Sequence, residues 1–186
     1  MLNSLSQAKN VSPQQDEVER WVTAADLTRL RYTISGKGEV DYLLFDGIGC
    51  DGFIWAYLKP YLEENGRVYH LHMRGHGKSH NPDNHNNVGI DWLISDWAQL
   101  LRVEGLDQSK RPLIALGHSM GVQVALELRT RRPNLPWASM ILMCGTFEHT
   151  AGNLYDTTMI ERILPLLKRA ANIGGHRLHK VWRRLV

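Results

Sequence analysis

Hydrophobic and polar residues follow one another along most of the chain in short blocks of strand or helix length. Blocks that predict strands occupy residues 21–35, 40–46, 67–73, 112–117 and 138–144. Blocks with apolar residues at helical spacing lie between them, at residues 53–65, 90–105 and 121–132. Strands that alternate with helices predict an α/β fold, in which a mostly parallel central sheet is covered by helices on both faces.

The two ends of the chain differ from this central region. Residues 1–19 are polar and aperiodic, so we expect an N-terminal tail without a site. Residues 20–147 are expected to form the core, since 186 residues support one sizeable hydrophobic core. Residues 148–186 hold two amphipathic stretches separated by Gly174–Gly175, which predicts a helical segment that opens a lid.

Composition and charge exclude several classes of protein. With 43% hydrophobic and 22% charged residues, the chain is typical of a globular protein and not of a disordered or membrane-spanning one. The net charge of +3 arises mainly beyond residue 160, where a solvated helix face explains it, so neither a nucleic-acid partner nor stable membrane association is expected. The first ten residues do not resemble a secretory signal, which favours a cytoplasmic location. Cys50 and Cys144 are expected to be buried thiols or pocket-lining groups.

One motif carries a specific chemistry. Residues 117–121, GHSMG, form a G-x-S-x-G pattern between a predicted strand and a predicted helix. Gly117 and Gly121 permit a turn so sharp that strand and helix leave no room for β-carbons, and this turn displays Ser119 as a candidate nucleophile. The backbone amide of Met120, at the start of the helix, is then placed to bind an oxyanion formed by attack on a carbonyl.

Three motifs in this order resemble the α/β-hydrolase superfamily: FDGIGCDGFIW at 45–55, HMRGHGKS at 72–79, and GHSMG. The resemblance implies a serine hydrolase that acts on ester or related acyl bonds of a small molecule and needs no cofactor or metal. It also implies that the backbone amide of Ile48 is the second oxyanion donor and that Arg74 is structural. Asp46 stands where the family commonly has histidine. Because Ser119 is not an aspartate, relatives of the epoxide hydrolase and haloalkane dehalogenase type are less expected.

The rest of the catalytic triad is missing from the predicted core. In the family the acid and then the histidine follow later strands, whereas only 67 residues follow Ser119 here, with one convincing strand. We therefore expect the acid and base beyond residue 186, so that this chain is a truncated, poorly active N-terminal portion of the fold. The weaker candidates within the chain are Glu127, Glu148, Asp156 and Glu161 for the acid, and His149, His176 and His179 for the base.

Two other functions remain open alternatives. A zinc site is suggested by His70, His72, His76, His80 and His85, but Arg74 lies inside this cluster and no carboxylate has a suitable spacing, so no metal site is predicted. The missing triad base also permits a non-catalytic protein of the same fold that binds a ligand or partner above Ser119. The sequence leaves the substrate, the type of bond cleaved and the oligomeric state undecided.

Overall fold

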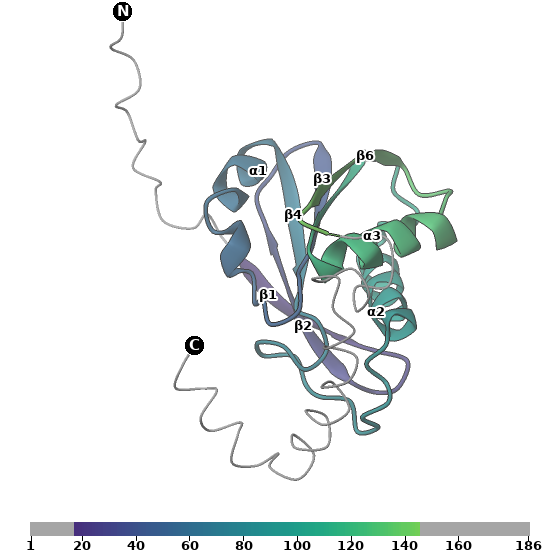
Figure 1. Cartoon of the computed structure of the whole chain (residues 1–186). Coiled ribbons are helices and arrows are strands. Elements are labelled where there is room, and N and C mark those ends of the chain that lie inside the picture. The colour runs from purple at the N-terminus through teal and green to yellow at the C-terminus, as the bar shows by residue number, and fades with distance from the viewer. Residues whose placement is uncertain (1–16, 146–186) are drawn as a thin grey trace, which may run out of the picture. The chain divides into compact units, whose positions relative to one another are not determined.

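The computed structural model describes residues 17–145, whose central feature is a six-stranded sheet in the order β1-β2-β4-β3-β5-β6 (Figure 1). The β1–β2 and β2–β4 pairs are antiparallel, whereas β4, β3, β5 and β6 run parallel to one another. This arrangement confirms the predicted mostly parallel sheet. The strands are β1 (Val18–Thr23), β2 (Arg29–Ser35), β3 (Val40–Phe45), β4 (Gly66–Leu71), β5 (Leu113–His118) and β6 (Trp137–Met143).

Helices cover both faces of the sheet, as predicted. The helices α2 (Ile90–Val103) and α3 (Met120–Arg131) lie on one side, and α1 (Lys59–Asn65) lies on the other (Figure 1). Alternation along β3 explains the two layers, because successive side chains of a strand point to opposite faces. Leu43 and Phe45 pack with α2 and α3, while Leu44 packs with Trp55 on the side of α1.

The first block of alternating residues, 21–35, contains a hairpin and not a single strand. The turn between β1 and β2 is closed by the Ala24 amide, which donates to the Thr28 carbonyl oxygen at 2.8 Å. The Asp26 carboxylate accepts the Thr28 amide at 3.2 Å, the local hydrogen bond that Asp often makes in turns. β1 begins at Val18, so the predicted tail at residues 1–19 extends two residues too far.

The predicted helix at 53–65 is wrong in its first half. A single turn of 3-10 helix, η1 (Phe53–Trp55), is followed by α1, which begins only at Lys59. Pro60 lies in the first turn of α1, where its missing N–H is tolerated. Proline further inside the predicted helix would have removed an internal hydrogen bond, so the helix starts next to it.

Arg74, the arginine of the RGHG loop, holds three parts of the fold together. Its buried guanidinium donates to both Asp96 oxygens of α2, at 2.8 and 2.6 Å. It also donates to Asp26 of the β1–β2 turn at 2.9 Å and to the Asn87 carbonyl oxygen at 2.6 Å. Burial raises the pKa of Asp96 above its ordinary value, although Arg74 acts against that rise. Arg74 is thus part of the scaffold, in agreement with its predicted structural role.

The expectation that both cysteines are buried or line a pocket is confirmed for burial only at Cys50. Cys50 is buried, but Cys144 is exposed, so the two cysteines do not share a core position. In the part of the chain described here, no helix is long and apolar enough to cross a membrane. The predicted lid at 148–186 lies outside the described residues, and the proposed division of the chain into tail, core and lid stays a prediction.

Replacing Arg74 tests the contribution of this buried network. Arg74→Met is expected to lower the free energy of unfolding by about 3–5 kcal/mol, because Asp96 and Asp26 would lose the cation with which both are paired. Urea unfolding followed by circular dichroism measures the change. Arg20→Met is the control, since Arg20 is 50% exposed in its pair with Glu104 and should cost less than about 1 kcal/mol. An equal decrease in the free energy of unfolding in both variants would contradict the scaffold role of Arg74.

Candidate functional site

Ser119 occupies the sharp turn between β5 and α3. Its backbone has φ 53° and ψ −121°, a conformation that L-residues rarely adopt and that costs about 1–3 kcal/mol. Two backbone hydrogen bonds hold the turn: the Ser119 amide donates to the Met143 carbonyl oxygen at 3.0 Å, and the Val122 amide donates to the Ser119 carbonyl oxygen at 3.1 Å. The residue itself is exposed. A strained backbone thus presents a hydroxyl at the carboxyl end of the parallel strands.

The glycines of the motif are required by close backbone packing. A β-carbon at Gly121 would lie 2.1 Å from the Phe45 carbonyl oxygen of β3, far inside contact distance. A β-carbon at Gly117 would lie 3.0 Å from the Gly121 carbonyl oxygen. The first turn of α3 therefore packs directly on the end of β3, and this contact determines where Ser119 is displayed.

The loop after β3, which we call the β3 loop (residues 46–52), packs against the same turn. A β-carbon at Gly47 would lie 2.9 Å from the Ser119 β-carbon and 3.2 Å from His118 Nδ1. Ile48 follows directly, with a side chain that is 73% exposed, and its amide has no hydrogen-bond acceptor within residues 17–145. Met120 is the first residue of α3, so its amide has no acceptor inside the helix. Both predicted donor amides therefore belong to segments in contact with Ser119.

A buried carboxylate stands at the start of the β3 loop. Asp46 is 1% exposed and accepts three hydrogen bonds, from the Gly52 amide at 3.0 Å, Trp55 Nε1 at 2.5 Å and His70 Nε2 at 2.9 Å. Burial by itself would raise the pKa of Asp46, but the three donors, with His70 foremost, hold it below its ordinary 3.8. Asp46 is therefore ionised at neutral pH, and each of its two oxygens accepts at least one hydrogen bond.

His76 of the RGHG loop holds the β3 loop from another side. The Gly49 amide donates to His76 Nε2 at 3.0 Å, and His76 Nδ1 lies 3.1 Å from the Arg74 carbonyl oxygen. Because Nε2 accepts, Nδ1 carries the proton and donates to that carbonyl. The histidine thus links the β3 loop to the scaffold that Arg74 organises.

The other histidines of the cluster are also engaged with protein groups. His70 and His72 lie on one face of the extended chain, as their spacing predicts, with ring centroids 4.4 Å apart. His72 contacts Asp51 and lies 2.5 Å from Arg31 Nη1. Burial, followed by the neighbouring His70, lowers the pKa of His72 to about 4. Among residues 17–145, no group of three or more His, Cys, Asp or Glu residues is arranged to hold a metal ion.

The described residues bring no base to Ser119. The neighbouring His118 has its Nδ1 buried without a partner, and no described histidine bonds the Ser119 hydroxyl. Of the candidate acids only Glu127 is described, and it lies in α3, where it pairs with Arg131 at 3.3 Å. The remaining candidates fall outside the described residues: Glu148, His149, Asp156, Glu161, His176 and His179.

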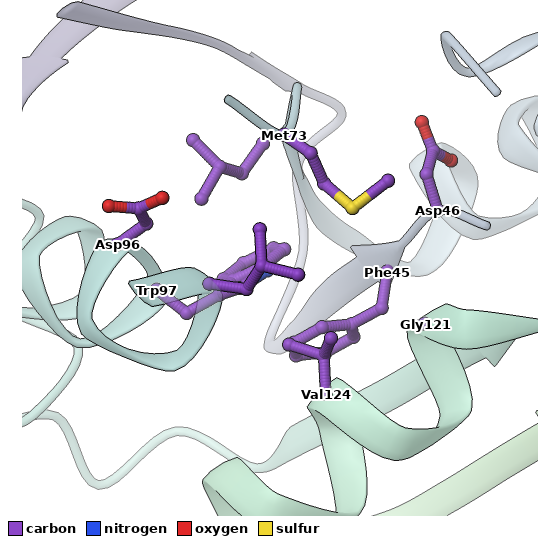
Figure 2. A pocket seen from close by; sticks show the side chains of 9 residues that line it. Phe45, Asp46, Met73, Asp96, Trp97, Gly121 and Val124 are labelled. Carbon is purple, nitrogen blue, oxygen red and sulfur yellow. The ribbon is translucent and has the colours of Figure 1, made fainter. Parts of the chain in front are cut away.

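A small pocket lies between the sheet and the helices α2 and α3, and Ser119 does not line it. Its wall includes the rings of Phe45 and Trp97, whose centroids are 4.2 Å apart. Figure 2 shows the Met73 side chain extending toward Asp46 at this pocket. Since most of its lining belongs to the buried core, we interpret it as a packing gap beneath the site.

Comparison with known proteins establishes the family. A family model described as "Hydrolase_4: Serine aminopeptidase, S33" matches residues 43–182, about three quarters of the chain. The chain belongs to this α/β-hydrolase family. This chain is 35% identical over 114 residues to pimeloyl-[acyl-carrier protein] methyl ester esterase of Methylococcus capsulatus. The aligned region covers 60% of this chain and 39% of the relative. The chain is 28% identical over 141 residues to human epoxide hydrolase 4, covering 75% of the chain and 36% of the relative.

A solved structure supports the same fold. An α/β hydrolase from Novosphingobium aromaticivorans aligns with a TM-score of 0.61 at 23% identity, covering 68% of this chain and 43% of that one. The chain spans less than two fifths of the length of the curated relatives it matches. The relatives carry the names of hydrolytic enzymes, so the family is one of hydrolases, whereas the activity of the whole protein belongs to the proposal below.

Sequence reasoning missed the residues that hold the β3 loop. The sequence marks Asp46 only as a departure from the family's histidine, His70 only as a metal candidate, and His76 as a metal candidate within the RGHG motif. A signal was present, because Asp46 directly follows the apolar run YLLF and a carboxylate in that position needs partners when it is buried. The hydrogen-bond partners lie 6 to 27 positions apart in the sequence, so no local pattern joins them.

Gly121→Ala tests the close contact between β3 and α3. Alanine normally stabilises a helix relative to glycine, yet here we expect the free energy of unfolding to fall by about 1–3 kcal/mol, because the new methyl group collides with the Phe45 carbonyl. Gly89→Ala is the matched control, since its β-carbon would meet nothing within 4 Å and its φ is −71°. Thermal unfolding measures the stability of both variants. If Gly121→Ala is as stable as Gly89→Ala, the close contact between Gly121 and the Phe45 carbonyl oxygen is contradicted.

The lowered pKa of His72 predicts a pH dependence of stability. The unfolded chain binds the His72 proton near pH 6.5 and the folded chain only near pH 4, so acidification between these values favours unfolding. His72→Gln should therefore lose less stability than the wild type between pH 7 and about pH 4.5, as measured by urea unfolding at each pH. The exposed His85→Gln serves as control and should follow the wild type. If the free energy of unfolding varies with pH in the same way for all three proteins, His72 is not the source of the pH dependence.

Proposed function

We propose that this α/β hydrolase is a serine hydrolase that cleaves esters or related acyl bonds, with Ser119 as nucleophile. The backbone amides of Ile48 and Met120 are the proposed oxyanion donors. The observation that carries the proposal is the exposed Ser119 on a strained strand-to-helix turn, with Gly47 packed against its β-carbon. Positive φ is uncommon for serine, and within residues 17–145 neither amide donates a hydrogen bond.

The proposed reaction has two steps. Ser119 Oγ attacks the carbonyl carbon of the substrate while its proton passes to a base that lies outside residues 17–145. The Ile48 and Met120 amides bind the negatively charged oxygen, each donor contributing about 10²–10³ in rate. The leaving group then departs with the proton, and water attacks the acyl-enzyme to release the acid and restore Ser119. No metal or cofactor takes part in this scheme.

We infer the substrate class from the chemistry of the Ser119 hydroxyl and from the name of one relative. A hydroxyl nucleophile beside two amide donors suits attack on a carbonyl, where an oxyanion develops. The relative from Methylococcus capsulatus is named as a methyl ester esterase, which supports a small acyl ester as the substrate here. Human epoxide hydrolase 4 is a relative too, but the serine at position 119 favours acyl chemistry over epoxide opening.

A second candidate is a non-catalytic protein of the same fold that binds a ligand above Ser119. The observation in its favour is that no described residue acts as a base toward the Ser119 hydroxyl. A fluorophosphonate probe separates the two functions, because it modifies only an activated serine. A binding protein would ignore the probe.

Ser119→Ala is the decisive variant, expressed from the complete natural gene. We expect hydrolysis of p-nitrophenyl butyrate to fall by at least about 10⁴-fold, because the nucleophile is gone. A fluorophosphonate should label the wild type at Ser119, as located by peptide mass spectrometry, and leave the variant unlabelled. Ser139→Ala, at an exposed serine of β6, should keep full activity and labelling. Ester hydrolysis that survives in Ser119→Ala would refute the assigned nucleophile.

A further inference from the structure

We propose that Asp46 is a positioning residue, whose buried carboxylate, together with His70, holds the β3 loop so that the Ile48 amide faces the carbonyl attacked by Ser119. The proposal rests on the function proposed above and adds a role for a side chain that touches no substrate. Asp46 acts through the backbone of the residues that follow it, and His70 acts through Asp46.

The carboxylate connects three separate elements. It accepts the amide of Gly52 at the end of the β3 loop, the indole N–H of Trp55 in η1 and Nε2 of His70 in β4. A carboxylate offers about four lone-pair sites, and three of them are filled here by donors. Since Asp46 is 1% exposed, water does not compete for these bonds.

These bonds close the β3 loop on itself. Asp46 begins the loop and its side chain accepts the amide of Gly52, which ends it. Inside the closed loop the Cys50 amide donates to the Gly47 carbonyl oxygen at 3.2 Å, and the Gly49 amide is taken by His76. The Ile48 amide lies between these anchored positions and has no acceptor within residues 17–145.

Without an anchor such a loop would be mobile. Glycine occupies positions 47, 49 and 52, and the last two have positive φ values of 75° and 81°. Glycine leaves the backbone free to sample many conformations, so the sequence alone does not hold the Ile48 amide in one place. The fixed carboxylate supplies the restraint, and preorganised donors are what make an oxyanion site effective.

His70 fits this role by its shape as well as by its hydrogen bond to Asp46. A β-carbon at Gly52 would lie 2.6 Å from His70 Cε1, so the imidazole packs directly on the end of the β3 loop. The side chain is buried with its Nε2 aimed at the carboxylate. Asparagine at position 46 would keep the size of the side chain, but its NH₂ group would face one or more of the three donors.

Asp46→Asn tests the proposal against Asp41→Asn in protein expressed from the complete natural gene. Asp41 lies at the opposite end of β3, is 0% exposed and pairs with Arg67 at 2.8 Å and Arg111 at 3.2 Å. Asp46→Asn should lower kcat and the rate of Ser119 phosphonylation about 10²-fold, with KM changed by less than about threefold. Asp41→Asn should lose stability but keep both rates within about threefold of wild type.

Amide hydrogen exchange provides a readout that does not depend on activity. Exchange across residues 46–55 should rise in Asp46→Asn and stay at the wild-type level in Asp41→Asn, because only the first variant releases the β3 loop. Unchanged exchange and rates in Asp46→Asn would overturn the positioning role and leave the proposed function intact. Equal rate losses in both variants would also overturn it, as a general effect of instability. If the fluorophosphonate does not label Ser119 in the wild type, the proposed function is overturned, and the positioning role of Asp46 is overturned with it.

Discussion

The fold around the candidate site depends on the contact between α3 and the end of β3, where glycine at position 121 leaves room for the Phe45 carbonyl oxygen. This contact brings the first turn of α3 directly onto the sheet and forces Ser119 into its unusual backbone conformation. Close-packed backbones cannot adjust gradually, so the position of the hydroxyl is determined to within the tolerance of a steric contact. The Gly47 backbone then approaches Ser119 from the neighbouring strand end.

The region around this contact is held by polar groups and not by apolar packing alone. Arg74 joins the RGHG loop to α2 and to the β1–β2 turn, His76 joins that loop to the β3 loop, and Asp46 closes the β3 loop. Of these residues Arg74 and Asp46 are buried, and buried polar groups stabilise a fold only when their partners are all in place. These contacts therefore select one arrangement of the RGHG loop, the β1–β2 turn and the β3 loop. The composition of these loops would otherwise permit many backbone conformations.

Family membership and chemical function rest on different observations. The sheet, its covering helices and the match to the family model place the chain among α/β hydrolases, a fold that its relatives use for ester as well as epoxide hydrolysis. What distinguishes the two chemistries is the residue displayed at the turn and the donors around it. In this chain the displayed residue is a serine, which is why we favour acyl transfer.

The sequence by itself determined the alternation of strands and helices, the presence of helices on both faces of a mostly parallel sheet, and the GHSMG turn, because hydrophobic periodicity and glycine spacing are local properties. It misjudged the hairpin within 21–35 and the start of α1, where Asp26 and Pro60 altered the backbone within a few residues. Only the tertiary structure decided that Asp46 meets His70, that His76 accepts the Gly49 amide, and that Arg74 spans three segments. These pairs are distant in sequence. Of the residues in them only His70 lies in a strand, where the register pairs it with Leu44, and the others lie in loops that the fold brings together, so a local pattern does not encode them.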